Sequence, residues 1–111
     1  MLKGNKIIRH EADNYPIYFS LTDGTTGEPY NLTGVSIQMA VAPAKSSTTN
    51  TFVSVGVVTD AVGGKVTFPM DTPAAIAATA RTYVYQVRLD TGTELITFME
   101  GLFDIEPSLF N

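Results

Sequence analysis

The residue of this sequence best suited to acid–base or metal chemistry is its one histidine, His10, which lies between Arg9 and Glu11 and close to Asp13. An imidazole beside carboxylates could serve as a general base or as a zinc ligand. A catalytic histidine also needs a nucleophile or an orienting partner, and zinc needs three or four ligands, whereas the chain offers one imidazole and no cysteine. We therefore expect His10 to be a solvated residue near the end of a strand.

Two pairs of carboxylates are spaced two residues apart, which places each pair on one face of a strand. Glu11 with Asp13, and Asp104 with Glu106, could act as general acid and general base. Neither pair has a basic or electrophilic companion suited to such chemistry. We expect all four to be solvated charges at strand edges.

The other candidates for ligand binding and nucleophilic catalysis lack the required context. Single aspartates occur in predicted turns, where they cap backbone donors, and they do not form the compact cluster that calcium needs. Residues 63–65 read Gly-Gly-Lys without the spacing of a nucleotide-binding loop, and no serine lies in a Gly-x-Ser-x-Gly motif. The sequence therefore predicts no catalytic residue, no metal site and no cofactor, in a protein that is not an enzyme.

The tyrosines could bind sugars, since carbohydrates stack on exposed aromatic rings. Tyr83 and Tyr85 belong to an apolar stripe and are expected in the core, where a hydroxyl can reach a backbone partner at the rim. Tyr18 and Tyr30 lie outside the apolar stripes and are expected to be exposed. We therefore regard Tyr18 and Tyr30 as candidate contacts for a partner.

An apolar pair, Leu109 and Phe110, follows Pro107 near the end of the sequence. This pair could anchor a neighbouring protein, or it could pack back on the core of its own domain. The sequence leaves both alternatives open, and the pair joins the candidate partner contacts.

Composition and charge exclude several classes of partner. The 111 residues fit a single domain, spanning 1–111, and a chain with 44% hydrophobic and 16% charged residues has a lean surface that a partner could cover in part. The net charge is −4 and the seven basic residues are scattered, so neither nucleic acid nor an anionic membrane is an expected partner. No apolar run approaches the roughly 20 residues of a spanning helix, and no secretory signal is recognisable. The absence of cysteine excludes disulfides and fits cytoplasmic synthesis.

Alternating apolar residues predict about seven short strands, separated by segments rich in glycine, proline and polar residues. The expected strands cover residues 6–10, 15–21, 35–41, 52–58, 65–70, 81–90 and 94–105, the last of them broken near Gly101 by a bulge or a close backbone approach. Within residues 52–58, Val53, Val55 and Val57 are expected to share one face. Such a pattern is typical of an all-β, antiparallel two-sheet sandwich.

One stretch departs from the rhythm of the strands. Asp71 and Thr72 can cap a helix, Pro73 suits its first turn, and alanines follow. The sequence therefore predicts one short helix near residues 73–79, which connects the two sheets and packs on the sandwich through Ile76.

Several phrases of the sequence carry a resemblance to a known family. They are Asn-Leu-Thr-Gly-Val-Ser-Ile at residues 31–37, Tyr-Val-Tyr-Gln-Val-Arg-Leu at residues 83–89 and Glu-Gly-Leu-Phe-Asp-Ile-Glu-Pro at residues 100–107, after a strand at residues 18–21 and a turn at residues 23–29. From about residue 6 to residue 107, the chain resembles the small immunoglobulin-like domain at the N-terminus of phage baseplate upper proteins and in related tail-fibre and virion proteins.

The resemblance implies an immunoglobulin-like β-sandwich in a phage virion structural protein of the baseplate, tail, neck or capsid decoration. It implies docking to other virion structural proteins, location in the virion after synthesis in the host cytoplasm, and no catalytic residues. Assembly into a homo-oligomer stays open. Because larger family members continue into fibre or receptor-binding regions where this sequence ends at Asn111, an adaptor role is expected rather than receptor binding. The alternative function is a carbohydrate-binding sandwich that contributes to host-surface adhesion.

Overall fold

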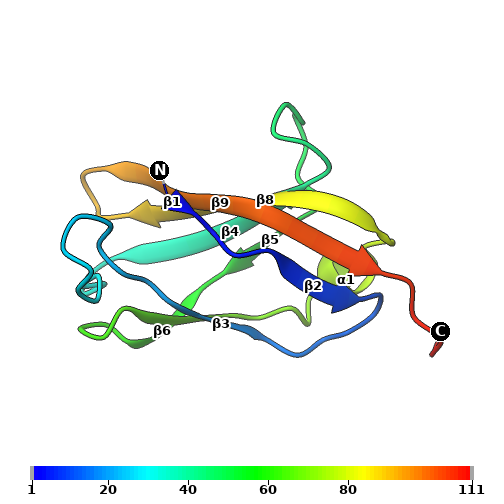
Figure 1. Cartoon of the computed structure of the whole chain (residues 1–111), viewed down its shortest axis with the longest axis horizontal. Helices are drawn as coiled ribbons and strands as arrows, with labels where there is room; N and C mark the ends of the chain where they lie inside the picture. The colour runs from blue at the N-terminus through cyan, green and yellow to red at the C-terminus, as the bar shows by residue number, and fades with distance from the viewer. Residues whose placement is uncertain (1, 111) are drawn as a thin grey trace.

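Two β-sheets pack face to face in the structure, a computed structural model that describes residues 2–110 (Figure 1). The larger sheet contains β1 (Leu2–Lys3), β2 (Ile7–His10), β4 (Ser36–Ala42), β5 (Phe52–Val55), β8 (Arg81–Asp90) and β9 (Leu95–Glu106). The smaller sheet contains β3 (Ile17–Ser20), β6 (Val57–Asp60) and β7 (Lys65–Phe68). The predicted all-β sandwich with one short helix is confirmed.

The strand order is β1–β9–β8–β4–β5 in the larger sheet, with β2 also beside β9, and β3–β7–β6 in the smaller sheet. β1 and β2 run parallel to β9, with Leu2 opposite Met99 and Ile7 opposite Phe103. The other described pairs are antiparallel. The prediction of a wholly antiparallel sandwich is therefore wrong at this edge. Alternation of side chains has period two in both kinds of pairing, so it does not encode strand direction.

The core lies between the sheets and follows the predicted apolar stripes of β4, β7 and β8. Its largest fully buried side chains include Tyr85, Phe68 and Phe103. Their rings meet neighbours edge to face: Phe19 with Phe68 at a centroid distance of 5.5 Å, and Phe52 with Phe103 at 5.8 Å. These are preferred geometries for aromatic pairs, and each pair lies within one sheet. The ring contact between the sheets is that of Phe19 on β3 with Tyr85 on β8, at a centroid distance of 6.2 Å.

The predicted strand at residues 52–58 is two strands, because the chain leaves the larger sheet at Gly56 and enters the smaller one. A Cβ atom at Gly56 would lie 2.6 Å from Ile37 Cγ2 and 2.8 Å from Val66 Cγ2, so the crossing requires a residue without a side chain. Phe52 and Ser54 face inward, and the Ser54 hydroxyl donates to the Pro69 carbonyl at 2.6 Å.

The three valines of this segment all face solvent, which the alternation alone did not reveal. Val53, Val55 and Val57 are 39%, 62% and 55% exposed. They do not share one sheet face as predicted, because Val53 and Val55 belong to β5 of the larger sheet and Val57 belongs to β6 of the smaller one.

β9 is continuous through Gly101, so the predicted break at this residue is wrong. The irregularity in the pairing of β8 with β9 lies between Val87 and Arg88, which face Met99 and Thr97. The alternative of a close approach at Gly101 is confirmed, since a Cβ atom there would lie 2.8 Å from Cε1 of Tyr85. Glycine at this position leaves room for the buried ring.

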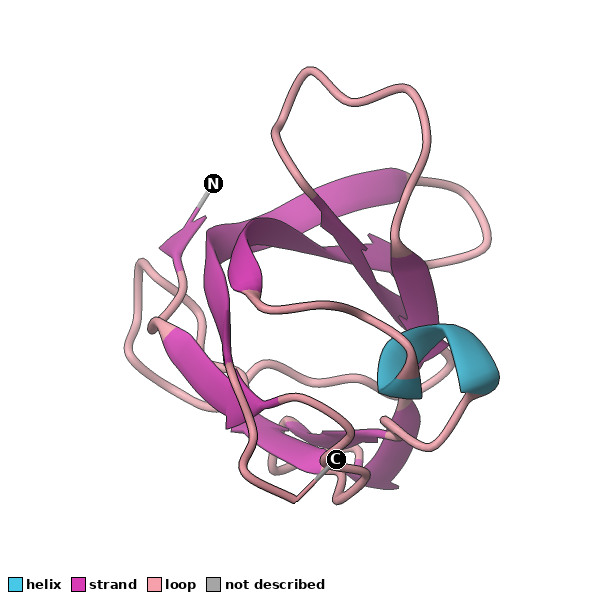
Figure 2. Cartoon of the chain, turned by 90° about the vertical axis from the view of Figure 1, so that its right-hand side faces the viewer, coloured by secondary structure: helices cyan, strands magenta, loops and turns pink. Residues whose placement is uncertain are grey.

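The helix α1 (Pro73–Ile76) follows β7 and precedes β8 in the chain. It lies at one end of the sandwich (Figure 2). The Thr72 hydroxyl caps it by accepting from the Ala75 backbone N–H at 3.3 Å, as the capping pattern predicted. The helix is shorter than expected and does not pack through Ile76, which is 37% exposed, because the small side chains of Ala75 and Ala78 face the core instead. Within residues 2–110, no helix is both long enough and apolar enough to span a membrane.

Candidate docking surface

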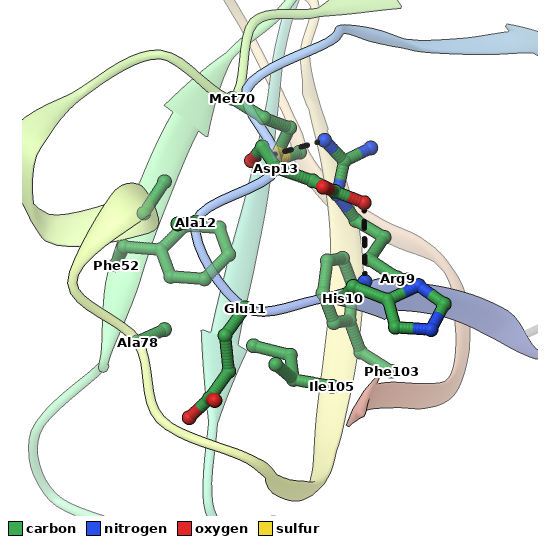
Figure 3. A pocket seen from close by; sticks show the side chains of 11 residues that line it. Arg9, His10, Glu11, Ala12, Asp13, Phe52, Met70, Ala78, Phe103 and Ile105 are labelled. Carbon is green, nitrogen blue, oxygen red and sulfur yellow. Dashed lines mark hydrogen bonds between the residues drawn. The ribbon is translucent and has the colours of Figure 1, made fainter. Parts of the chain in front are cut away.

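The titratable residues at the bend between β2 and β3 fasten the local backbone (Figure 3). Arg9 is only 5% exposed, and its Nη2 donates to the carbonyls of Tyr15 at 2.6 Å and Asp13 at 3.3 Å. The guanidinium also lies 3.9 Å from the centroid of the Tyr15 ring. Burial lowers the pKa of Arg9, and the nearby Tyr15 and Asp13 oppose this shift. Sequence reasoning missed Arg9, because nothing in its neighbours marks it as buried.

The carboxylates of this bend are also engaged with the backbone. Asp13 Oδ2 accepts from the His10 N–H at 3.2 Å, and Glu11 Oε2 accepts from the Ala80 N–H at 2.9 Å. Glu11 thereby ties the β2–β3 bend to the segment before β8, so the expectation that it is merely a solvated charge is wrong. His10 is exposed, as predicted.

The same correction holds at the other predicted carboxylate pair. Asp104 lies 3.6 Å from the Lys6 ammonium and accepts from the Thr82 hydroxyl at 3.2 Å. It therefore has a basic companion, supplied by a residue far away in the sequence. In the described part of the chain, no three histidine or acidic side chains gather in a group that could hold a metal ion.

The cavity under the β2–β3 bend is too small for an organic ligand. Its volume is about 10 Å³, and it is lined by the bend itself and by core residues such as Phe52, Met70 and Phe103 (Figure 3). Such a space is about the size of one water molecule. The bend is therefore a structural feature of the fold.

A larger apolar area lies on the outer face of the larger sheet. Ala42 of β4 is opposite Val84 of β8, which in turn is opposite Leu102 of β9, and Ala40 lies two residues before Ala42. We call Ala40, Ala42, Val84 and Leu102 the outer patch. Two adjoining hollows of about 410 and 120 Å³ share Val84 in their lining. Leu102 is 48% exposed, so the patch offers apolar contact area to another molecule.

An ion pair borders the outer patch. Lys45 Nζ, from the loop at residues 43–50, donates to Glu100 Oε1 at 2.9 Å, and Gln86 Nε2 donates to Glu100 Oε2 at 3.4 Å. The hydrogen bond from Lys45 holds the pKa of Glu100 below its ordinary value. An apolar centre with a polar margin is the usual arrangement of a protein interface.

A second, more polar cleft of about 550 Å³ separates the N-terminal segment from β3. It is lined by Lys3, Gly4, Asn5, Tyr18, Phe19, Ser20, Thr22, Tyr85 and Met99. At this cleft, the Tyr85 hydroxyl donates to the Asn5 carbonyl at 2.7 Å. Burial raises the pKa of Tyr85.

The predicted contact residues occupy different places. Tyr18 is 74% exposed beside the polar cleft, as expected, but Tyr30 is half-buried and packs edge-on against Phe98 at a centroid distance of 5.1 Å. Leu109 and Phe110 are 98% and 93% exposed, so the alternative that they pack on the core of their own chain is wrong. The C-terminal segment continues beyond the end of β9 (Figure 1). The structure does not gather these four residues into one site.

The exposed apolar residues of the outer face were missed at the sequence level. Leu102 lies between Gly101 and Phe103, and no polar residue beside it marks its face of the strand as the outer one. The sequence did contain one signal: Phe103 and Ile105 mark the buried face of β9. Because successive side chains point to opposite faces of a strand, Leu102 must lie on the outer face.

Comparison of the sequence with protein-family models and with curated proteins finds no match. Among solved structures, the fold is similar to that of the N-terminal domain of phage TP901-1 ORF48. The two share 15% sequence identity with a TM-score of 0.56, and the match covers 96% of this chain and 85% of that one. At this identity the similarity shows a common fold.

Proposed function

We propose that this protein is a phage virion structural protein whose sandwich serves as a docking module for other virion proteins. The observation that carries the proposal is the fold shared with a phage protein domain over 96% of the chain. The sequence phrases that resemble phage baseplate upper proteins support the same assignment, with the virion as the location of the protein. The proposed role is non-catalytic, since Arg9, Glu11 and Asp13 around His10 hydrogen-bond backbone groups and so hold the bend in place.

The strand arrangement supports an immunoglobulin-like identity for the domain. In variable-type immunoglobulin domains, one sheet carries strands G, F, C and C′, and the other includes B, E and D. The orders β9–β8–β4–β5 and β3–β7–β6 match these two sets. The Tyr83 hydroxyl donates to the Thr79 carbonyl at 2.8 Å, which is the geometry of the tyrosine corner found at the start of strand F.

An aromatic contact stands where antibody domains have their disulfide. The second cysteine of those domains follows the corner tyrosine by two residues, which is the position of Tyr85. Its ring lies 6.2 Å from that of Phe19 on β3, so the two sheets are joined by ring packing in a chain without cysteine.

The outer patch supports docking through the larger sheet. Its members come from three adjacent strands, so the hydrogen bonds of the sheet hold them in fixed positions relative to one another. We place the contact with other virion proteins there, with Leu102 as the central side chain. Tyr18 and Tyr30 do not support the carbohydrate-binding alternative, because one ring is exposed and the other is packed against Phe98.

The test is the protein composition of purified virions of the phage whose genome encodes this chain. We expect mass spectrometry to find the protein in a fixed number of copies per particle, and immunogold labelling to locate it at one site of the virion. Its absence from complete particles would contradict the proposal.

A pair of variants tests the docking surface. Leu102→Asp places a charge in the outer patch and is expected to reduce the yield of complete particles, because a buried, unpaired charge weakens an interface. Leu95→Asp is the matched control, since Leu95 is 65% exposed near the β8–β9 hairpin and outside the patch. Equal yields from the two variants would remove the outer patch as the docking surface.

A further inference from the structure

We propose that two copies of this chain associate through the free edges of their β5 strands, in an antiparallel pairing centred on Ser54. The inference deepens the proposed docking function, because it names a second copy of the chain as one of the docked partners. The resulting contact joins two larger sheets into one continuous sheet across a two-fold axis.

The backbone geometry leaves the outer side of β5 available. β5 is the last strand of its sheet and pairs with β4, with Val53 opposite Ala40 and Val55 opposite Gln38. The Gly56 N–H donates to the Ile37 carbonyl at 2.8 Å, so these two residues form a hydrogen-bonded pair of the antiparallel ladder. Because these bonds alternate along a strand, the N–H and C=O groups of Val53 and Val55 point away from β4.

The side chains of this edge favour association. Val53 and Val55 are 39% and 62% exposed, and residues 52–59 contain no charged residue and no proline. Natural edge strands are usually protected by lysine, proline or a bulge. The other edges of this sandwich have such protection: β6 has an irregular register near Asp60, Pro16 precedes β3, and the N-terminal edge carries Lys3 and Lys6.

The sequence of the edge fits a second copy. Val53-Ser54-Val55 reads the same in both directions, so a two-fold axis at Ser54 sets each Val53 opposite the Val55 of the other copy. Both outward-facing residues of each strand are then paired, and four valines form one apolar cluster on the outer face. A chain with a net charge of −4 repels its copies, and this uncharged edge places no like charges in contact.

The loop that precedes β5 is tied to the outer face of the larger sheet by an ion pair. The loop at residues 43–50 reaches over the outer face toward β9, where Lys45 binds Glu100 at 2.9 Å. A two-fold contact at β5 is also self-complementary and closes with two copies, so it does not lead to open-ended association.

The test is the oligomeric state of the purified full chain, measured by sedimentation equilibrium over a range of concentrations. We expect a dimer for the natural chain, and Val55→Lys should raise its dissociation constant about tenfold or more, because lysine blocks edge pairing. Val62→Lys is the matched control, since Val62 is 71% exposed in the turn before β7, and it should leave the dimer unchanged. A natural chain that stays monomeric, or equal association of the two variants, would overturn the proposal.

Cross-linking tests the register. The chain has no cysteine, so a disulfide reports only the introduced thiols. Mixed Val53→Cys and Val55→Cys chains should form a disulfide-linked dimer in higher yield than either variant alone, because position 53 faces position 55 of the other copy. Equal yields would overturn the pairing about Ser54. A failed dimer would leave the virion assignment intact, since particle composition tests that assignment separately.

Discussion

The Tyr85 hydroxyl is expected to stabilise the fold by joining the N-terminal segment to the core. Tyr85 is 0% exposed, and its hydroxyl donates to the Asn5 carbonyl at 2.7 Å. Tyr85→Phe keeps the ring in place and removes only this donor. A lost hydrogen bond costs about 1 kcal/mol, and an acceptor left without a partner raises the cost to about 1–3 kcal/mol. For a domain of this size, each kcal/mol lowers Tm by about 4 °C.

The assay is urea unfolding followed by circular dichroism, comparing Tyr85→Phe with Tyr18→Phe. Tyr18 is 74% exposed, so removal of its hydroxyl should leave the free energy of unfolding within about 0.5 kcal/mol of the natural chain. If Tyr85→Phe were as stable as Tyr18→Phe, the hydroxyl would not fasten the N-terminal segment, and the reasoning would be refuted.

Alkaline pH provides an independent measurement on the same residue. Burial raises the pKa of Tyr85 above its ordinary value of 10.0, so the folded chain favours the neutral phenol. The stability from this preference is fully present below the unfolded pKa and is lost as the pH rises through the folded pKa. We expect the free energy of unfolding of the natural chain to fall more steeply above pH 10 than that of Tyr85→Phe. Parallel curves would contradict the assignment.

Three further predictions concern single residues. Gly64→Ala should lower the free energy of unfolding by about 3 kcal/mol or more, because φ is +69° and a Cβ atom would overlap the Leu21 carbonyl oxygen. Gly34→Ala, where φ is +73° but the space is open, should lower it by only about 1–2 kcal/mol. Equal losses in urea unfolding would refute the overlap at Gly64. Arg9→Lys should lower the same free energy by about 1–3 kcal/mol through loss of the planar donor and the stacking on Tyr15, and an unchanged unfolding midpoint would count against it. Lys45→Met should raise the pKa of Glu100 in an NMR titration, because the hydrogen bond from Lys45 is the main cause of its lowered value; an unchanged titration would show that the pair does not form in solution.

Local patterns in the sequence predicted most strands, because alternating apolar residues mark the side of a strand that packs against the one core. Ile37, Met39 and Val41 alternate with smaller or polar residues and are all buried in β4. Thr72 followed by Pro73 predicted the start of α1, since a cap satisfies backbone donors within one turn. Such features depend on residues close together in the chain, and they hold whichever neighbour the strand or helix meets.

The exposure of the β5 valines was harder to predict because both faces of residues 52–58 carry apolar side chains. Val53 and Val55 are apolar residues of a strand with high β propensity, yet they face solvent, whereas Ser54 faces inward. The inward position of Ser54 is stabilised by its hydrogen bond to Pro69, a residue 15 positions away. Hydrophobicity therefore favoured the wrong face for the core.

An all-β sandwich with one capped helix turn was predictable from the sequence, because alternation, turn residues and caps act over a few neighbouring positions. The folded chain adds features that no local pattern encodes: the parallel pairing at β9, the change of sheet at Gly56, the burial of Arg9 and the separation of Tyr18 from Leu109 and Phe110. Each of these depends on atoms from distant segments competing for the same space or the same hydrogen-bond partner. Such competition is settled only when the two sheets have packed.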